Sequence, residues 1–200
     1  MAITNYNTLV SAVGDWLDRP DLATESRLST FIQLAEARLN RLLEDPEMEV
    51  TSNSTATGAA TALPADYGSM VSISTGSGHL TPVGSVEFAS FDSISGIPRY
   101  YSITDGAIGF GPSNFTTPIR MVYRRRLPAL SITNQTNWLM TLAPDVYLYG
   151  TLVQAEAFLG EDDRLVGWKA MFDESIDELK QDASRRKWGA GTLTPSLGRS

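Results

Sequence analysis

The fold of this chain follows from residues 143–160, which read APDVYLYGTLVQAEAFLG. Pro144 suits the first position of a helix, where its missing N–H is not needed, and Asp145 complements the positive end of the helix dipole. Apolar residues then recur at the spacing of one buried helical face, at Leu148, Leu152, Ala155 and Leu159. Gly160 is a typical helix terminator. The stretch therefore predicts a helix from Pro144 to Gly160.

A further helix is predicted directly after this one. The acidic residues 161–163 are favoured in a first turn, the basic residues 185–187 are favoured in a last turn, and Gly189 follows as a terminator. The apolar stripe of this helix comprises Leu165, Trp168, Phe172, Ile176, Leu179 and Ala183. The two segments together predict a C-terminal pair of helices.

The N-terminal region predicts a second helix pair. Residues 5–17 carry one apolar stripe, and a second stripe runs from Thr24, a suitable N-cap, to about Leu43. Pro20 breaks the pattern between them, because it disfavours helix at the residue before it. The stripes comprise Tyr6, Leu9, Val10, Val13, Trp16 and Leu17, and then Leu28, Phe31, Ile32, Ala35, Leu39 and Leu42. We expect these helices to form a hairpin.

Residues 46–137 differ from both ends of the chain in being rich in Pro, Gly, Ser and Thr. Apolar bursts at 69–75, 99–104 and 118–124 are separated by turn sequences such as 75–78 and Asp105-Gly106, which predicts at least four short strands. Residues 51–62 are poor in large apolar groups and allow two interpretations, a mobile loop or a weak edge strand.

The predicted fold class is therefore α+β. The helix pairs at 1–45 and 138–188 form a four-helix bundle, with a small antiparallel β-module (46–137) inserted between them. Residues 189–200 consist mainly of Gly, Thr, Ser and Pro, and we expect them to form a flexible tail.

Composition limits the functions that this chain can have. Its 16 basic and 23 acidic residues give a net charge of −7, which argues against a protein that grips DNA through clustered cations. The sequence has no cysteine, so disulfides and cysteine metal sites are impossible. It contains no apolar run long enough to span a membrane, and its N-terminus does not resemble a signal peptide. These features fit synthesis and assembly in a cytoplasm.

The sequence offers no catalytic residue, metal site or cofactor site. His79 is the sole histidine, and neither a zinc ligand set nor an acid–base partner accompanies it. The acids at 161–163 are explained more simply as helix-start residues than as a catalytic pair. The glycine-rich stretch 106–111 lacks the Lys-Ser/Thr and the helix that a phosphate-binding loop needs, so it predicts a strand and turn.

Charge and aromatic clusters are the better candidates for contacts with partners. Arg124, Arg125 and Arg126 form the sharpest charge cluster, although successive residues of a strand alternate between its faces. We interpret the cluster as an inter-subunit or partner contact through salt bridges rather than as a charged, solvated edge strand. Trp16 and Trp168 are predicted to be core residues, Trp138 to anchor the β-module to the bundle, and Trp188 to dock a partner.

Several local patterns, taken in order, resemble the head-to-tail adaptor (head-completion) proteins of short-tailed phages and gene-transfer particles. The matching segments are residues 31–41 (FIQLAEARLNR), 63–67 (LPADY), Tyr123 with 127–131 (LPALS), 136–139 (TNWL) and 143–150 (APDVYLYG). The family order is kept, and the segments span almost the whole chain. The sparse stretches 51–62 and 74–78 depart from the family pattern.

The resemblance implies a non-enzymatic virion subunit that assembles in the host cytoplasm into a ring, usually of twelve copies, under the portal protein. It implies that the C-terminal tail reaches the portal, that the β-module faces a downstream nozzle or tube protein, and that DNA passes through the ring without sequence-specific binding. The expected partner-binding residues are Arg124, Arg125, Arg126, Arg185, Arg186, Lys187, Trp188, Leu193 and Leu197. Two alternatives are another tail or tail-completion subunit and a phage cell-wall hydrolase.

Overall fold

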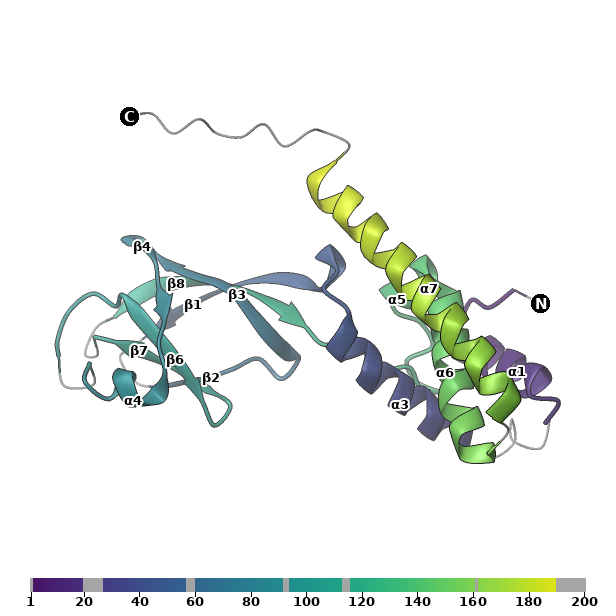
Figure 1. The fold of residues 1–200 in the computed structure, drawn as a ribbon. Helices are drawn as coiled ribbons and strands as arrows, with labels where there is room; N and C mark the ends of the chain where they lie inside the picture. Colours follow the sequence, from purple (N-terminus) through teal and green to yellow (C-terminus); the bar gives the residue numbers. More distant parts are fainter. Residues whose placement is uncertain are drawn as a thin grey trace. The chain divides into compact units, whose positions relative to one another are not determined.

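The computed structural model describes residues 2–19, 27–56, 60–91, 94–112, 116–160 and 162–189, with the side chains of residues 162 and 163 left out. These residues form six α-helices and two four-stranded sheets, which confirms the predicted α+β class. The chain divides into two compact units (Figure 1). The helical unit contains Met1–Pro46 and Leu127–Ser200, and the β unit contains Glu47–Arg126.

The helical unit is built from five helices in the described residues. These are α1 (Tyr6–Trp16), α3 (Arg27–Leu42), α5 (Trp138–Leu142), α6 (Pro144–Leu159) and α7 (Asp162–Trp188). The predicted ends of α6 are confirmed, because it starts at Pro144 and Gly160 follows it in the left-handed conformation, with φ of 75°. Gly189 similarly follows α7 with φ of 67°. The predicted N-cap Thr24 lies outside the described residues.

Helix α6 is the centre of the helical unit, because it contacts α1, α3, α5 and α7. The sequence predicts one apolar face for α6, but its burial extends around much of the helix. The buried residues are Val146, Tyr147, Leu148, Gly150, Thr151, Leu152, Val153, Ala155 and Glu156. A helix with neighbours on several sides has no solvent face to reserve for polar residues.

Gly150 allows α3 and α7 to approach α6 closely. A Cβ atom at this position would lie 2.9 Å from Cε2 of Phe172 on α7 and 3.6 Å from Cβ of Ala35 on α3. The guanidinium of Arg38 lies 4.7 Å from the centroid of the same Phe172 ring. The Phe172 ring therefore packs between the Arg38 side chain of α3 and the backbone of α6 at Gly150.

A buried carboxylate attaches the returning chain to the helices. Glu36, which is 4% exposed, accepts hydrogen bonds at Oε1 from the Leu130 N–H at 2.7 Å and from the Tyr147 hydroxyl at 3.1 Å. The Asn137 side-chain amide donates to the Tyr147 hydroxyl oxygen at 2.6 Å. One turn after Glu36, Asn40 Oδ1 accepts from the Leu127 N–H at 2.7 Å. These side chains hold the segment 127–137 against α3 and α6.

The β unit contains eight strands and one short helix in the described residues. In chain order they are β1 (Glu49–Ala56), β2 (Thr61–Ala62), β3 (Tyr67–Thr75), β4 (Gly78–His79), β5 (Thr81–Pro82), α4 (Ser85–Phe88), β6 (Tyr100–Thr104), β7 (Ala107–Gly111) and β8 (Thr117–Arg125), and a 3₁₀ turn, Pro46–Met48, precedes β1. The sheet orders are β1-β8-β3-β4 and β2-β7-β6-β5. The predicted turn at Asp105-Gly106 is confirmed, since both residues have positive φ between β6 and β7.

For the β unit, the structure corrects one prediction and decides between two interpretations that the sequence left open. The prediction of an antiparallel module is wrong for β5 and β6, which pair in parallel. The reason is the connection between them, which is long enough to include α4 and so returns the chain in the same direction. Of the two interpretations of residues 51–62, the edge strand is confirmed for 51–56, which belong to β1.

Both sheets contribute to one apolar core in the β unit. Strand β8 alternates strictly over this core, with Ile119, Met121 and Tyr123 buried while Arg120 is exposed. The buried residues of the cluster are Ala56, Ile73, Leu80, Tyr101, Ile108, Phe110, Ile119, Met121 and Tyr123.

The first prediction concerns the close approach at Gly150. Gly150→Ala inserts a methyl group into contact with Phe172, and we expect it to lower the free energy of unfolding by about 1–3 kcal/mol through overpacking. Gly167→Ala is the matched control, since Gly167 is an exposed residue of helix α7 with open space at its Cβ position. That change should stabilise the protein by about 0.5–1 kcal/mol. Urea unfolding followed by circular dichroism measures both, and equal effects of the same sign would contradict the packing argument.

The second prediction concerns Glu36. Burial raises the pKa of its carboxyl group, and the hydrogen bonds from Leu130 and Tyr147 lower it by less. The folded protein therefore holds this proton more tightly than the unfolded chain. The contribution to stability is fully present below the unfolded pKa of about 4.3 and is lost as pH rises through the folded pKa.

Glu36→Gln keeps an acceptor oxygen and removes the titration, so its unfolding free energy should fall less steeply with pH above about 4.3. Urea titrations across this pH range measure the slope, and Glu174→Gln, an exposed change on α7, is the control. A slope identical to wild type in Glu36→Gln would exclude Glu36 as the titrating group. Glu36→Ala leaves two donors without their acceptor and should cost about 2–3 kcal/mol.

Candidate partner-binding surfaces

The described residues contain no group of three or more His, Cys, Asp or Glu residues that could hold a metal ion. His79 is exposed in the two-residue strand β4. Glu161 and the side chains of Asp162 and Asp163 lie outside the described part of the chain. Within the described ranges, no helix is both long enough and apolar enough to cross a membrane.

The end of α7 is held in place by an ion pair with the segment that follows α3. Arg186 donates from Nη2 to Oδ2 of Asp45 at 2.7 Å and from Nη1 to Oδ1 at 3.3 Å, and its Nε lies 2.9 Å from Oδ2 of Asp182. Asp45 is 2% exposed. Partial burial lowers the pKa of Arg186, but the two carboxylates outweigh this effect and raise it overall. Among the predicted contact residues, Arg186 is therefore already engaged within the chain.

The neighbours of Arg186 at the end of α7 have large exposed fractions. Arg185 and Lys187 are exposed, and Trp188, the last residue of α7, is 63% exposed. The Lys187 ammonium lies 5.8 Å from the centroid of the Trp188 ring. Leu193 and Leu197, which were also predicted as contact residues, lie outside the described residues. The end of α7 thus carries the exposed residues Arg185, Lys187 and Trp188, and the ion pair between Arg186 and Asp45 fixes its position.

The arginine cluster lies at the end of β8. Arg124 and Arg125 are half-buried, and Arg126 directly follows the strand and is exposed. Arg124 lies opposite Glu49 of β1 in the sheet register, and Arg125 Nη2 donates to the Glu47 carbonyl at 3.4 Å. The Arg126 N–H donates to the Asp66 carbonyl at 2.7 Å. The cluster therefore closes one end of the sheet, and Arg126 is its most exposed member.

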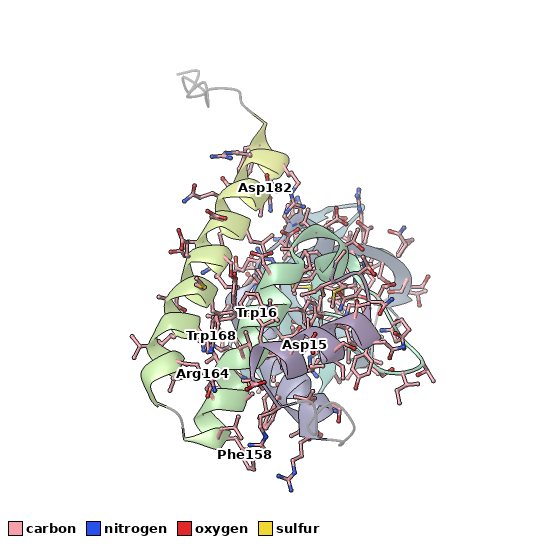
Figure 2. The ribbon with its side chains drawn as sticks, turned by 90° about the vertical axis from the view of Figure 1, so that its right-hand side faces the viewer. Asp15, Trp16, Phe158, Arg164, Trp168 and Asp182 are labelled. Carbon is pink, nitrogen blue, oxygen red and sulfur yellow. The ribbon has the colours of Figure 1, made fainter. Side chains whose placement is uncertain are left out.

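An aromatic cluster that the sequence did not predict lies where α1, α6 and α7 meet. The Trp16 ring is 5.4 Å from the Trp168 ring and 6.1 Å from the Tyr149 ring, measured between centroids. Figure 2 shows Trp16 and Trp168 side by side, with Arg164 closer to the start of α7. Arg164 Nε lies 3.1 Å from Oε1 of the buried Glu156, which ties the start of α7 to α6.

The prediction that Trp16 is a core residue is wrong, because 44% of its surface is exposed. Trp16 is the last residue of α1, so its ring lies at the edge of the helical unit, against Trp168, rather than beneath it. Trp168 is partly buried and Trp138 begins α5. The polar neighbours Asp15 and Asp18 were the signal in the sequence that α1 ends at the surface.

Comparison with known protein families gives a match over nearly the whole chain. The model of a family described as SU10 adaptor protein matches residues 4–196. Comparison with curated proteins gives no match.

The third prediction tests the anchor at the end of α7. Arg186→Ala leaves the carboxylate of Asp45 buried without this partner, and we expect a loss of about 2–3 kcal/mol in unfolding free energy. This is below the 3–5 kcal/mol typical of a fully buried pair, because 29% of the Arg186 side chain is accessible. Arg185→Ala is the matched control and should change stability by less than about 0.5 kcal/mol. Denaturant unfolding provides the measurement, and an equal effect of the two changes would contradict an anchoring role for Arg186.

Proposed function

Because this chain belongs to the SU10 adaptor protein family, we propose that it forms a ring beneath the portal of a tailed phage, extends the DNA channel and joins the head to the tail. The family is one of structural adaptors, which makes the chain a phage structural protein that associates with other virion components. The match over residues 4–196 is the observation that carries the proposal. The ring, its usual number of twelve copies and its place under the portal are inferred from this membership.

The helical unit supports a rigid role in such a ring. Helix α6 is enclosed by four other helices, and the pairs α1/α3 and α6/α7 supply the four long helices of the proposed bundle. A body with a central buried helix resists deformation, because its packed side chains have few alternative arrangements. A subunit of a ring needs this stiffness to keep a constant angle with its neighbours.

The end of α7 is the proposed contact with the portal. Arg185, Lys187 and Trp188 project from a helix end that the Arg186–Asp45 pair holds in place. Aromatic and arginine side chains contribute disproportionately to protein interfaces. The tail at 189–200, with Leu193 and Leu197, is proposed to continue this contact on the portal.

The β unit is the proposed contact with the next tail component, a nozzle or tube protein. It carries the arginine cluster at the end of β8, where Arg126 is exposed. An exposed cation of this kind suits an acidic patch on a partner and favours correct orientation more than affinity.

The charge of the subunit fits a channel through which DNA slides. Twelve copies, each with a net charge of −7, carry −84 formal charges. An acidic ring repels the phosphate backbone and so prevents DNA from adhering during passage. The proposed DNA contact is therefore transient and independent of sequence.

The fourth prediction is that the protein binds isolated portal rings through the end of α7 and the tail. Light scattering after size-exclusion chromatography should show that the intact protein adds a ring of copies to the portal of the same phage. A chain truncated after Trp188 should not bind, and Trp188→Ala should weaken binding by at least about tenfold, as expected for an aromatic hot spot.

Trp16→Ala is the matched control, since it also removes an exposed tryptophan from the helical unit. We expect it to leave portal binding unchanged. Failure of the intact protein to bind portal rings would contradict the adaptor proposal. Binding that survives both truncation and Trp188→Ala would place the portal contact elsewhere on the subunit.

A further inference from the structure

The edges of the two sheets differ sharply in length. The four edge strands are β1, β2, β4 and β5, and among the described residues three of them are only two residues long. One of these short strands, β5, ends in Pro82, which cannot donate a ladder hydrogen bond. Strand β1 has eight residues. Short edges and prolines are the usual means of preventing unwanted strand pairing, and β1 has neither.

Strand β1 is also regular along its whole length. It pairs with β8 at eight consecutive positions, from Glu49 opposite Arg124 to Ala56 opposite Thr117, with no shift in register. The pairing of β3 with β8 contains two register shifts, between Tyr67 and Ser69 and between Met70 and Ser72. Such irregularities twist a strand and impair further pairing, so the edge of β3 that extends beyond β4 is protected. Strand β1 has no such irregularity among its described residues.

The side chains of β1 do not discourage pairing either. Its sequence, EVTSNSTA, contains no lysine, arginine or proline, and its one charged residue, Glu49, is at the start. Thr51, Asn53, Ser54 and Thr55 are exposed. An edge strand directs alternate N–H and C=O groups away from its neighbour, where they can accept another strand. The outer edge of β1 is therefore a template for strand addition.

We propose that β1 pairs antiparallel with β1 of a second copy of this chain. Sheet order would then run β4-β3-β8-β1 in one copy and continue as β1-β8-β3-β4 in the other, in one eight-stranded sheet around a twofold axis. Pairing centred on Ser52 places this residue opposite its own copy and Thr51 opposite Asn53 of the other copy, and such hydroxyl and amide pairs stabilise antiparallel sheets. It also places Glu49 of each copy opposite Thr55 of the other, so the strand's one charge does not face itself.

The lack of charge along most of β1 allows a second copy to approach this edge. The chain carries a net charge of −7, so two chains can associate closely only where their facing surfaces carry little charge. Residues 50–56 form an uncharged segment that meets this requirement. The contact is proposed for the free subunit, and it differs from the contacts of a ring. A twofold contact closes after two copies and cannot repeat around a ring of subunits that share one orientation.

The fifth prediction uses the absence of cysteine in the natural sequence. Single variants Ser52→Cys, Asn53→Cys and Ser54→Cys, alone and in equimolar pairs, each place one thiol on β1. Directly opposed residues of an antiparallel pair have Cα atoms about 4.5–5.5 Å apart, within the range of a disulfide. Under mild oxidation we expect a cross-linked dimer that forms most efficiently at one position or pair. Thr104→Cys, on the exposed surface of the interior strand β6, should stay uncross-linked.

Sedimentation equilibrium of the isolated protein provides a second measurement that needs no oxidation. Wild type should sediment as a dimer, and the double variant Thr51→Lys/Asn53→Lys should raise the dissociation constant by at least about tenfold, since like charges then face each other across the axis. Thr104→Lys should leave it unchanged. A monomeric wild type at about 100 μM, a dimer unaffected by the two lysines, or cross-linking no more efficient on β1 than at position 104 would each overturn the proposal. None of these outcomes depends on portal binding.

Discussion

The helical unit depends on the carboxylate of Glu36, which is buried in α3 and receives the Leu130 N–H and the Tyr147 hydroxyl. These three residues come from α3, from the segment that leaves the β unit and from α6, so one side chain joins parts of the chain that are far apart in sequence. A buried acceptor without donors is costly, so the unit is stable only when all three segments are in place. The packing of α6 against its neighbours follows from this arrangement, because Tyr147 is part of both the network and the core.

Local signals made much of the fold predictable. Pro144, Gly160 and Gly189 mark helix ends through their own backbone preferences, which do not depend on the rest of the protein. The parallel pairing of β5 and β6 could not be predicted, because it depends on where the connection through α4 leads the chain. The burial of α6 on several sides and the exposure of Trp16 were also missed. The burial of α6 depends on how many helices surround it, which periodicity within one helix does not show. The exposure of Trp16 was missed because the apolar stripe was given more weight than the neighbouring Asp15 and Asp18.

The candidate surfaces show the same division between local and distant effects. The basic residues at 185–187 were visible in the sequence, but Arg186 pairs with Asp45, which is 141 positions away. The sequence therefore identified the basic cluster, but it could not distinguish Arg186, which pairs with Asp45, from Arg185 and Lys187. The edge of β1 was left open as loop or strand because its serines and threonines give little apolar signal. The partner strand β8, which supplies the ladder and the buried alternation, lies more than sixty residues later.

The division of the chain into a continuous β unit and a discontinuous helical unit has a consequence for synthesis. The β unit is complete once residue 126 has left the ribosome, whereas the helical unit also needs residues 127–188. Domains generally fold as units during translation. We therefore expect the β unit to fold first. The apolar faces of α1 and α3 stay uncovered until α6 has left the ribosome. The helical unit is completed only in the final third of translation, so a ribosome that stops early releases a folded β unit together with α1 and α3 that lack their packing partner α6.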